Sequence, residues 1–334
     1  MRILLTLLLI AAAAWSGYWY IGKTSVTEGF GTWLEARRAE GWAAEAGTLE
    51  TKGFPNRFDT TFTDITLADP ETGLAWQAPM FQILALSYKP NHVIAVWPDE
   101  QMIATPQEKY DVESSDMRAS IVVGADLSLP LERTTLTAEE LSVTPRSADQ
   151  PTRAEAVRLG AERVAAHPSS YRLGLAAEGL SPPLEWRVRL DPAGKLPERF
   201  DAFEADVTVE FDKPWDRSAI EQARPQPRRI DIRLAKARWG RLELQAAGEV
   251  TVDDQGFPLG EITIKARNWR DILKMAVASG TLPDAIAGTL EDGLGLISQM
   301  AGNPKTLDIP LNFKGGKVRL GPVPLGDAPL LRLR

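Results

Sequence analysis

Few side chains in this sequence combine the chemistry and the spacing of a catalytic site. The chain has two histidines, His92 and His167, and only His167 has a hydroxyl close by, Ser169 after Pro168. A nucleophilic serine needs a base and an orienting acid arranged in space, which adjacency in sequence does not supply. The G-x-S-x-G elbow, the H-E-x-x-H pair, the Walker loop and the dinucleotide fingerprint are absent from the sequence. We therefore expect no enzymatic activity, and a hydrolase is the weakest alternative.

Metal and cofactor sites have equally little support. Cysteine is absent, which excludes thiolate catalysis, iron–sulfur clusters and cysteine zinc sites. Asp253 and Asp254 are adjacent acids without the alternating ligands and closing glutamate of a calcium loop, so they predict a turn. A pair of carboxylates far apart in the chain, as in glycosidases, stays open. We expect no cofactor and no metal.

Composition narrows the class of protein further. The chain has 334 residues, of which 44% are hydrophobic and 25% charged, enough for one large or two moderate domains. The net charge of −7 argues against nucleic acid as a partner, because such binding needs a basic face.

An apolar segment covers residues 3–21 after Met1 and Arg2, close to the length that crosses a bilayer. Trp15, Tyr18, Trp19 and Tyr20 gather at its far end, where aromatic rings suit the headgroup region. A cleaved signal peptide, with Ala12 and Ala14 before the cut, is the alternative. Both interpretations place the body outside the inner membrane, in the periplasm, and we favour a retained anchor over residues 1–22.

A helix near the membrane is predicted next, over residues 23–50. Ser25 and Glu28 have capping-box spacing, and Phe30, Trp33 and Leu34 recur at helical spacing. This helix could lie on the membrane surface or pack on the body, and the spacing favours neither.

The body, residues 51–334, has the two-residue period of strands with one wet and one apolar face. We expect a predominantly antiparallel α+β fold, a long curved sheet or a sandwich or half-barrel, with two halves that meet near residues 150–230. The predicted strands lie within residues 119–131, 184–190, 203–211, 230–234, 242–252, 262–266 and 307–313.

Turns and helices interrupt this pattern. Residues 253–256 and 315–316 predict hairpin turns, and residues 224–229 predict an exposed polyproline-like connection. Three helices are expected: one opened by a capping box at Thr152 and ended at His167, one between Asn268 and Gly280, and one after Pro283.

Several Gly- and Pro-rich motifs resemble an uncharacterised bacterial family, domain of unknown function 2125. They comprise residues 53–59, 88–94, 253–282 and 315–326, the last with Pro329. Within them we single out as structural positions Gly53, Phe54, Pro55, Arg57, Phe58, Pro90, Asn91, Gly321, Pro322, Pro324 and Gly326. The family has no established activity, so the resemblance transfers no catalytic residue. Its layout is loosely similar to AsmA-like envelope proteins associated with lipid transport, and this analogy concerns the fold alone.

The function expected from these features is non-enzymatic. An exported, anchored sheet protein could bind or pass phospholipid or another envelope lipid along its apolar face. The same face could instead be an ordinary covered core. The alternative function is a scaffold that docks another envelope protein through sheet edges or the Trp-rich N-terminal region.

Overall fold

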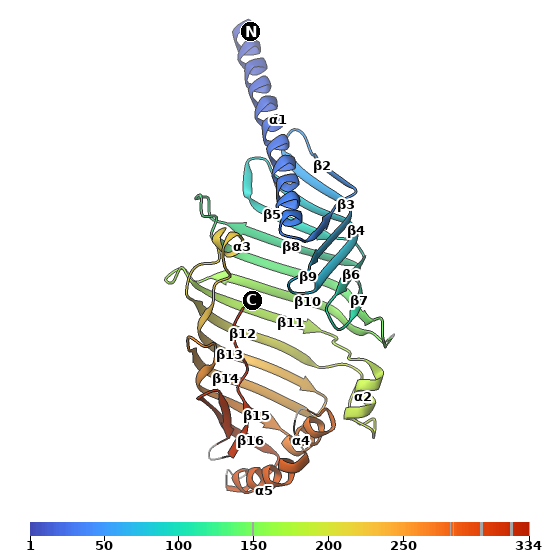
Figure 1. Cartoon of the computed structure of the whole chain (residues 1–334), viewed down its shortest axis with the longest axis vertical. Helices are drawn as coiled ribbons and strands as arrows, with labels where there is room; N and C mark the ends of the chain where they lie inside the picture. The colour runs from blue at the N-terminus through green and yellow to red at the C-terminus, as the bar shows by residue number, and fades with distance from the viewer. Residues whose placement is uncertain (149, 281, 283, 301–302, 321–322, 334) are drawn as a thin grey trace. The chain divides into compact units, whose positions relative to one another are not determined.

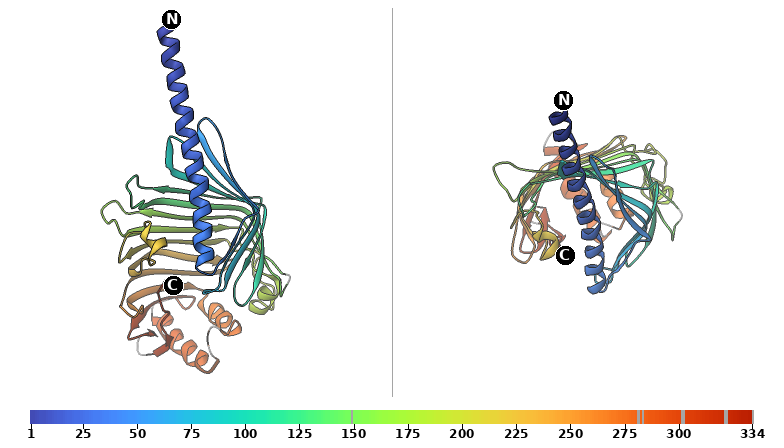
Figure 2. Two further views of the ribbon diagram at one scale, coloured as in Figure 1. Left: turned by 45° about the horizontal axis from the view of Figure 1, so that its top comes forward. Right: turned by 90° about the horizontal axis from the view of Figure 1, so that it is seen from above.

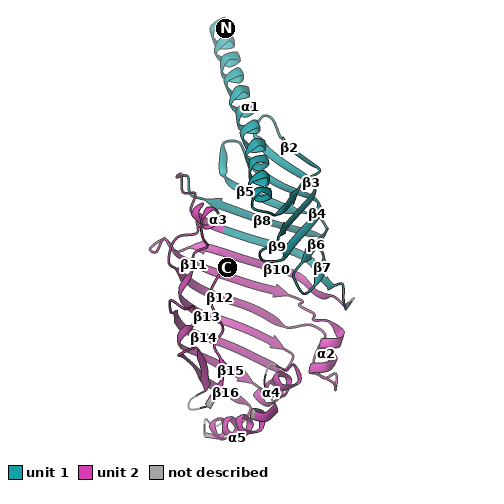
Figure 3. Ribbon diagram, in the orientation of Figure 1, with its two compact units in different colours: residues 1–125, 134–149 teal, residues 126–133, 150–334 magenta. Residues whose placement is uncertain are grey.

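The computed structural model describes residues 1–148, 150–280, 282, 284–300, 303–320 and 323–333. They form two compact units, residues 1–125 with 134–149 and residues 126–133 with 150–334 (Figure 3). Both consist mainly of antiparallel strands, so the predicted fold class is confirmed. The predicted domain boundaries stay predictions.

The N-terminal segment forms one uninterrupted helix, α1 (Arg2–Ala39), which belongs to unit 1. Its C-terminal part lies along β1–β3, whereas its N-terminal part projects away from the unit (Figures 1 and 2). The helix is long and apolar enough to cross a membrane. The predicted capping box is wrong, because Ser25 and Glu28 lie in the middle of this helix. α1 ends at Ala39, where Gly41, at φ +91°, donates its amide to the Arg38 carbonyl.

The sheet of unit 1 is antiparallel throughout its described pairings. The long strands β3 and β4 pair along most of their length, β1 and β2 flank β3, and β4 pairs with β5 and β6. β5 pairs with β8, β6 with β7, and β7 with β9. The strands are β1 (Ala43–Glu45), β2 (Thr48–Lys52), β3 (Arg57–Asp69), β4 (Leu74–Leu86), β5 (Lys89–Trp97), β6 (Glu100–Ala104), β7 (Lys109–Glu113), β8 (Asp116–Val123) and β9 (Leu131–Pro145), of which residues 134–145 lie in unit 1.

Unit 2 is an antiparallel meander in which each strand pairs with the next one along the chain. Hairpin order of this kind needs only short connections. The strands are β10 (Thr152–Arg163), β11 (Ser170–Glu178), β12 (Ala202–Phe211), β13 (Pro227–Trp239), β14 (Leu242–Val252), β15 (Pro258–Arg267), β16 (Thr306–Lys314), β17 (Lys317–Leu320) and β18 (Val323–Asp327).

Both predicted hairpin turns are confirmed. The Gly256 amide, at φ +92°, donates to the Asp253 carbonyl over 2.9 Å between β14 and β15. Gly315 and Gly316 both have positive φ between β16 and β17, as a type I′ turn requires.

Two of the three predicted helices are confirmed and one is wrong. α4 (Trp269–Ala278) and α5 (Asp284–Met300) form where expected, and their apolar sides meet β15 and β16 in a core around Trp269, Leu294 and Leu307. Residues 152–163 form strand β10 instead of a helix, because they pair with β11 over eight residues. Two further short helices, α2 (Leu184–Leu190) and α3 (Ser218–Glu221), were not predicted as helices.

Three other sequence predictions differ from the structure. The alternating stretch 184–190 is helix α2, in which Trp186 stacks on Trp239 at 6.3 Å. The predicted strand 119–131 ends at Val123, and the following loop leaves Leu127 exposed. The connection at 224–229 is only partly exposed, because Pro225 is fully buried and β13 begins at Pro227.

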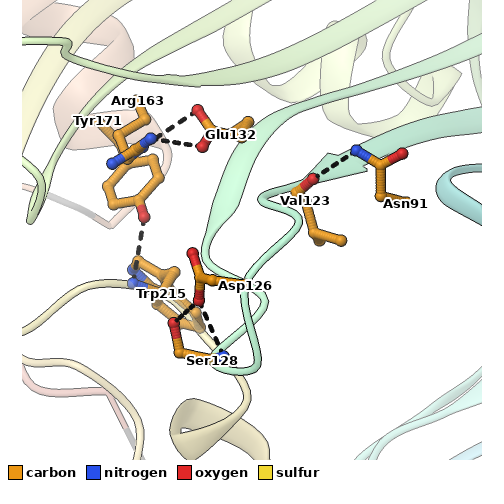
Figure 4. A network of polar contacts seen from close by, with 8 residues as sticks. All are labelled: Asn91, Val123, Asp126, Ser128, Glu132, Arg163, Tyr171 and Trp215. Carbon is orange, nitrogen blue, oxygen red and sulfur yellow. Dashed lines mark hydrogen bonds and ion pairs between the residues drawn. The ribbon is translucent and has the colours of Figure 1, made fainter.

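The polar contacts of unit 2 fix the start of its meander. The Trp215 backbone amide donates to the buried Tyr171 hydroxyl over 3.2 Å, and burial raises the pKa of that phenol (Figure 4). Arg163 forms an ion pair with Glu132, whose hydrogen bonds raise the pKa of the guanidinium. These contacts are structural.

Candidate functional site

The aromatic residues at the far end of the apolar segment bind two loops of unit 1. The indole N–H of Trp15 donates to the Pro55 carbonyl over 2.8 Å, and that of Trp19 donates to the Arg57 carbonyl over 2.8 Å. The Tyr18 hydroxyl donates to the Ser87 carbonyl over 2.5 Å. We call these three side chains, the loop 53–58 and the turn 86–90 the collar. It fastens α1 to the sheet.

Glycine and aromatic residues make the close approach at the collar possible. Gly53 has φ +110°, and a Cβ there would lie 2.8 Å from the Arg57 Cβ and 2.9 Å from the Arg57 oxygen. A Cβ at Gly22 would lie 2.5 Å from the Phe58 ring. The Trp19 ring meets Phe54 edge-on at 5.3 Å and stacks on Phe58 at 6.3 Å. The motif at 53–58 therefore builds the seat of the helix.

An apolar cavity lies next to the collar, between α1 and strands β3–β5 of unit 1. Its volume is about 410 Å³, within the range of small-ligand pockets. None of its lining side chains is charged; they are Ser25, Val26, Gly29, Phe30 and Trp33 of α1, and Phe58, Thr60, Ile83, Ala85, Pro90 and Val93 of the sheet. The cavity therefore suits an apolar ligand rather than a charged one.

Contacts beside the cavity join its helical wall to the sheet. The Thr27 hydroxyl donates to the Thr51 hydroxyl over 2.8 Å, and Thr51 and Thr60 are joined over 2.9 Å while fully buried. Further along α1, Leu34 packs in a core with Phe62, and Arg38 Nε donates to the Ala44 carbonyl over 2.6 Å. These contacts hold α1 against the sheet alongside the cavity.

The motif residues predicted from sequence divide between the two units. Pro90 lines the cavity, and the amide of the neighbouring Asn91 donates to the Val123 carbonyl over 3.0 Å (Figure 4). Pro324 and Gly326 lie in β18 of unit 2, paired with Arg319 and Val318. Gly321 and Pro322 lie outside the described residues.

The two histidines do not form a catalytic triad in the described part of the chain. His92 in β5 is 2.8 Å from the Ser120 hydroxyl, a pairing that sequence distance concealed, and no carboxylate is hydrogen-bonded to the ring there. His167 lies in the turn between β10 and β11, where its backbone bonds to Val164 and Ser170.

A second cavity in unit 1 is acidic. Its volume is about 520 Å³, and Asp64, Glu100, Asp111 and Glu113 are among its lining residues. Asp111 forms a bidentate pair with Arg146, which lowers the pKa of the Asp111 carboxyl. Within the described residues no group of three or more acids and histidines is placed to hold a metal ion.

Unit 2 has an apolar face that is only partly covered. Strand register aligns one apolar residue from each of seven strands, Leu159, Leu175, Ala205, Ala235, Ala246, Ile264 and Ile309. Ile309 is buried beside α5, whereas Leu159 at the other end is 43% exposed and the residues between are half-buried. This face is covered at β15–β16 and partly open toward β10.

Sequence reasoning found the aromatic cluster but not its partners. It assigned Trp15, Tyr18 and Trp19 to a membrane-interface belt, and nothing local indicated bonds to carbonyls about forty or more positions away. The cavity was also missed, and Gly29, a glycine inside a helix next to Phe30, is a local signal of a place where α1 has no side chain.

Comparison with known proteins agrees with the sequence motifs. The family model described as an uncharacterized protein conserved in bacteria, DUF2125, matches residues 19–329. No curated protein and no solved structure matches the chain, so the looser similarity to AsmA-like proteins stays a prediction. Since the family match covers most of the chain, the chain belongs to this family.

Proposed function

We propose that this member of the family is an anchored, non-enzymatic protein of the bacterial cell envelope that binds the acyl chain of a lipid. The observation that carries the proposal is the uncharged cavity of about 410 Å³ between α1 and β3–β5. In this proposal α1 crosses the inner membrane through its apolar N-terminal part, and the body lies in the periplasm.

The energetics favour exchange with a membrane rather than permanent capture. Each methylene group taken from water into the cavity gains about 0.8 kcal/mol. The same group gains a similar amount in a bilayer, so transfer between bilayer and cavity changes the free energy little. An acyl chain can therefore enter and leave a cavity beside the membrane anchor, because it is bound there about as strongly as in the bilayer.

The half-buried face of unit 2 supports the same proposal independently. It presents apolar side chains from seven consecutive strands, and α5 covers only one end. A surface of this kind in a soluble body favours an apolar ligand or partner.

The alternative function, a scaffold that docks another envelope protein, loses part of its support. It assigned a docking role to the Trp-rich N-terminal region, but Trp15 and Trp19 donate their indole hydrogens to loops of the same chain. Sheet edges remain as its docking surface, and it stays a prediction.

Filling the cavity with a larger side chain tests whether it binds lipid. Gly29 lines the cavity and a Cβ there meets nothing within 4 Å, so we expect Gly29→Leu to occupy the space without a clash. Gly31 has equally free space but does not line the cavity, which makes Gly31→Leu the matched control. Both changes replace a helical glycine and should stabilise the helix by similar amounts, up to about 1 kcal/mol.

The assay is photocrosslinking of the full chain in vesicles that contain a diazirine-labelled phospholipid. We expect crosslinks to the cavity-lining residues Val26, Phe30 and Val93 that Gly29→Leu abolishes and Gly31→Leu retains. Crosslinks to residues 3–14, which report the surrounding bilayer, should be the same in the natural chain and both variants. Equal labelling of Val26, Phe30 and Val93 in both variants would rule the proposal out.

A further inference from the structure

We propose that the collar is partly immersed in the membrane, with Phe54, Leu86 and Tyr88 inserted among the lipids of the leaflet that α1 enters last. The partner is the bilayer surface itself. This inference rests on the proposed anchoring through α1 and is independent of what the cavity holds.

The collar leaves only a short part of α1 free. Residues 3–14, between Arg2 and the first collar contact at Trp15, span only about 18 Å at 1.5 Å per residue. The hydrocarbon core is about 30 Å thick, which the whole apolar segment 3–21 approaches at about 28 Å. The last third of the apolar segment is therefore the part that the loops of the collar contact.

The two loops of the collar expose large side chains. Phe54 at the tip of the loop 53–58 is 57% exposed, and Tyr88 at the tip of the turn 86–90 is 63% exposed, with Leu86 beside it also exposed. Tyr20 and Ile21 on α1 are exposed at the same level of the helix. Large, mainly apolar side chains are thus exposed on two separate loops next to an apolar helix, and such exposure suits a lipid environment.

Lysine side chains lie next to the collar. Lys23 follows the apolar segment and lies 5.9 Å from the Trp19 ring, and Lys89 follows Tyr88 directly. Lys52, just before Gly53, is also exposed but forms an ion pair with Glu50 over 2.8 Å, so its charge is balanced within the chain. Long cationic side chains bury their stems in apolar surroundings and place their charge at the phosphates. Lys23 and Lys89 would therefore fix the depth at which the collar lies in the membrane.

The test uses single cysteines, since the natural chain has none. Phe54→Cys, Leu86→Cys and Tyr88→Cys carry a nitroxide label in the full chain, reconstituted in phosphatidylcholine–phosphatidylglycerol vesicles. The control is Leu74→Cys, which is 51% exposed and lies at the other end of β3 and β4 in the same unit. Collision rates with oxygen, which partitions into lipid, and with a water-soluble nickel complex are compared.

We expect the oxygen-to-nickel ratio at positions 54 and 88 to exceed that at position 74 several-fold, with position 86 between them or equal to 88. Ratios at 54 and 88 equal to that at 74 in protein that resists carbonate extraction would overturn immersion while leaving the anchor intact. Protein that carbonate removes from the vesicles would overturn the anchoring as well. Nickel access at 54 and 88 that falls only when envelope proteins are added would instead assign the surface to a protein partner, and immersion would be wrong.

Discussion

The seat of α1 depends on a glycine whose replacement has a calculable cost. Gly53→Ala adds a Cβ where the backbone has φ +110° and where the Arg57 carbonyl carbon and oxygen lie 3.1 and 2.9 Å away. A non-glycine residue at positive φ costs about 1–2 kcal/mol, and overpacking adds about 1–3 kcal/mol. We therefore expect Gly53→Ala to lower the free energy of unfolding of unit 1 by about 2–5 kcal/mol.

Gly41→Ala separates these two contributions. Gly41 also has positive φ, at +91°, but a Cβ there meets nothing within 4 Å. Its replacement should cost only the conformational part, about 1–2 kcal/mol. The difference between the two variants then measures the close approach of the loop 53–58 alone.

The measurement is a urea titration of the full chain in mild detergent, followed by a fluorophore on Leu74→Cys, which reports on unit 1. Because the Arg57 carbonyl accepts the Trp19 indole hydrogen, Gly53→Ala should also increase protease cleavage in the loop 53–58. Equal unfolding energies for the Gly53 and Gly41 variants would refute the reasoning, because the contact distances around Gly53 would then have no energetic consequence.

Two predictions concern unit 2. Leu294→Ala removes a buried side chain from the core around Trp269 and should lower the free energy of unfolding by about 2–5 kcal/mol. Leu296→Ala, on the exposed side of the same helix, should change it by no more than about 0.5 kcal/mol. A fluorophore on Leu127→Cys reports the unfolding of unit 2, and similar losses for both variants would contradict the docking of α5. Burial raises the pKa of Tyr171 above its ordinary value of about 10, so stability should be flat below pH 10 and fall as pH rises from there through the folded-state pKa, since the unfolded state loses this proton first. Tyr171→Phe should lose this alkaline decline, and urea titrations from pH 8 to 11 check it.

Sequence periodicity predicted the sheet well where both neighbours of a strand are the strands before and after it in the chain. Residues 203–211 and 242–252 alternate in type, and each pairs with adjacent strands in the chain. Residues 152–163 contain Ala, Glu and Arg at helical spacing, yet pairing with β11 outweighs that propensity. For residues 184–190, seven positions are too few to separate the two periods, and Pro183 at the helix start was the better signal.

The collar lay beyond sequence reasoning for a different reason. Its hydrogen bonds join residues 38, 40 and 69 positions apart, and backbone carbonyls accept them. A carbonyl carries no sequence signature, so the motif at 53–58 could be noticed but its partner could not. The exposed Phe54 and Tyr88 likewise have no periodic context that marks them.

The unbroken course of α1 from the apolar segment into unit 1 has a consequence for kinetics. A flexible linker lets a tethered domain sample a volume that grows with linker length, and its effective concentration at the membrane falls accordingly. A helix fixed at Trp15, Trp19 and Leu34 gives unit 1 no such freedom. In a chain anchored through α1, the cavity mouth would stand at one height and one orientation over the bilayer, so each encounter with a lipid would repeat the same geometry and no time would be spent in search.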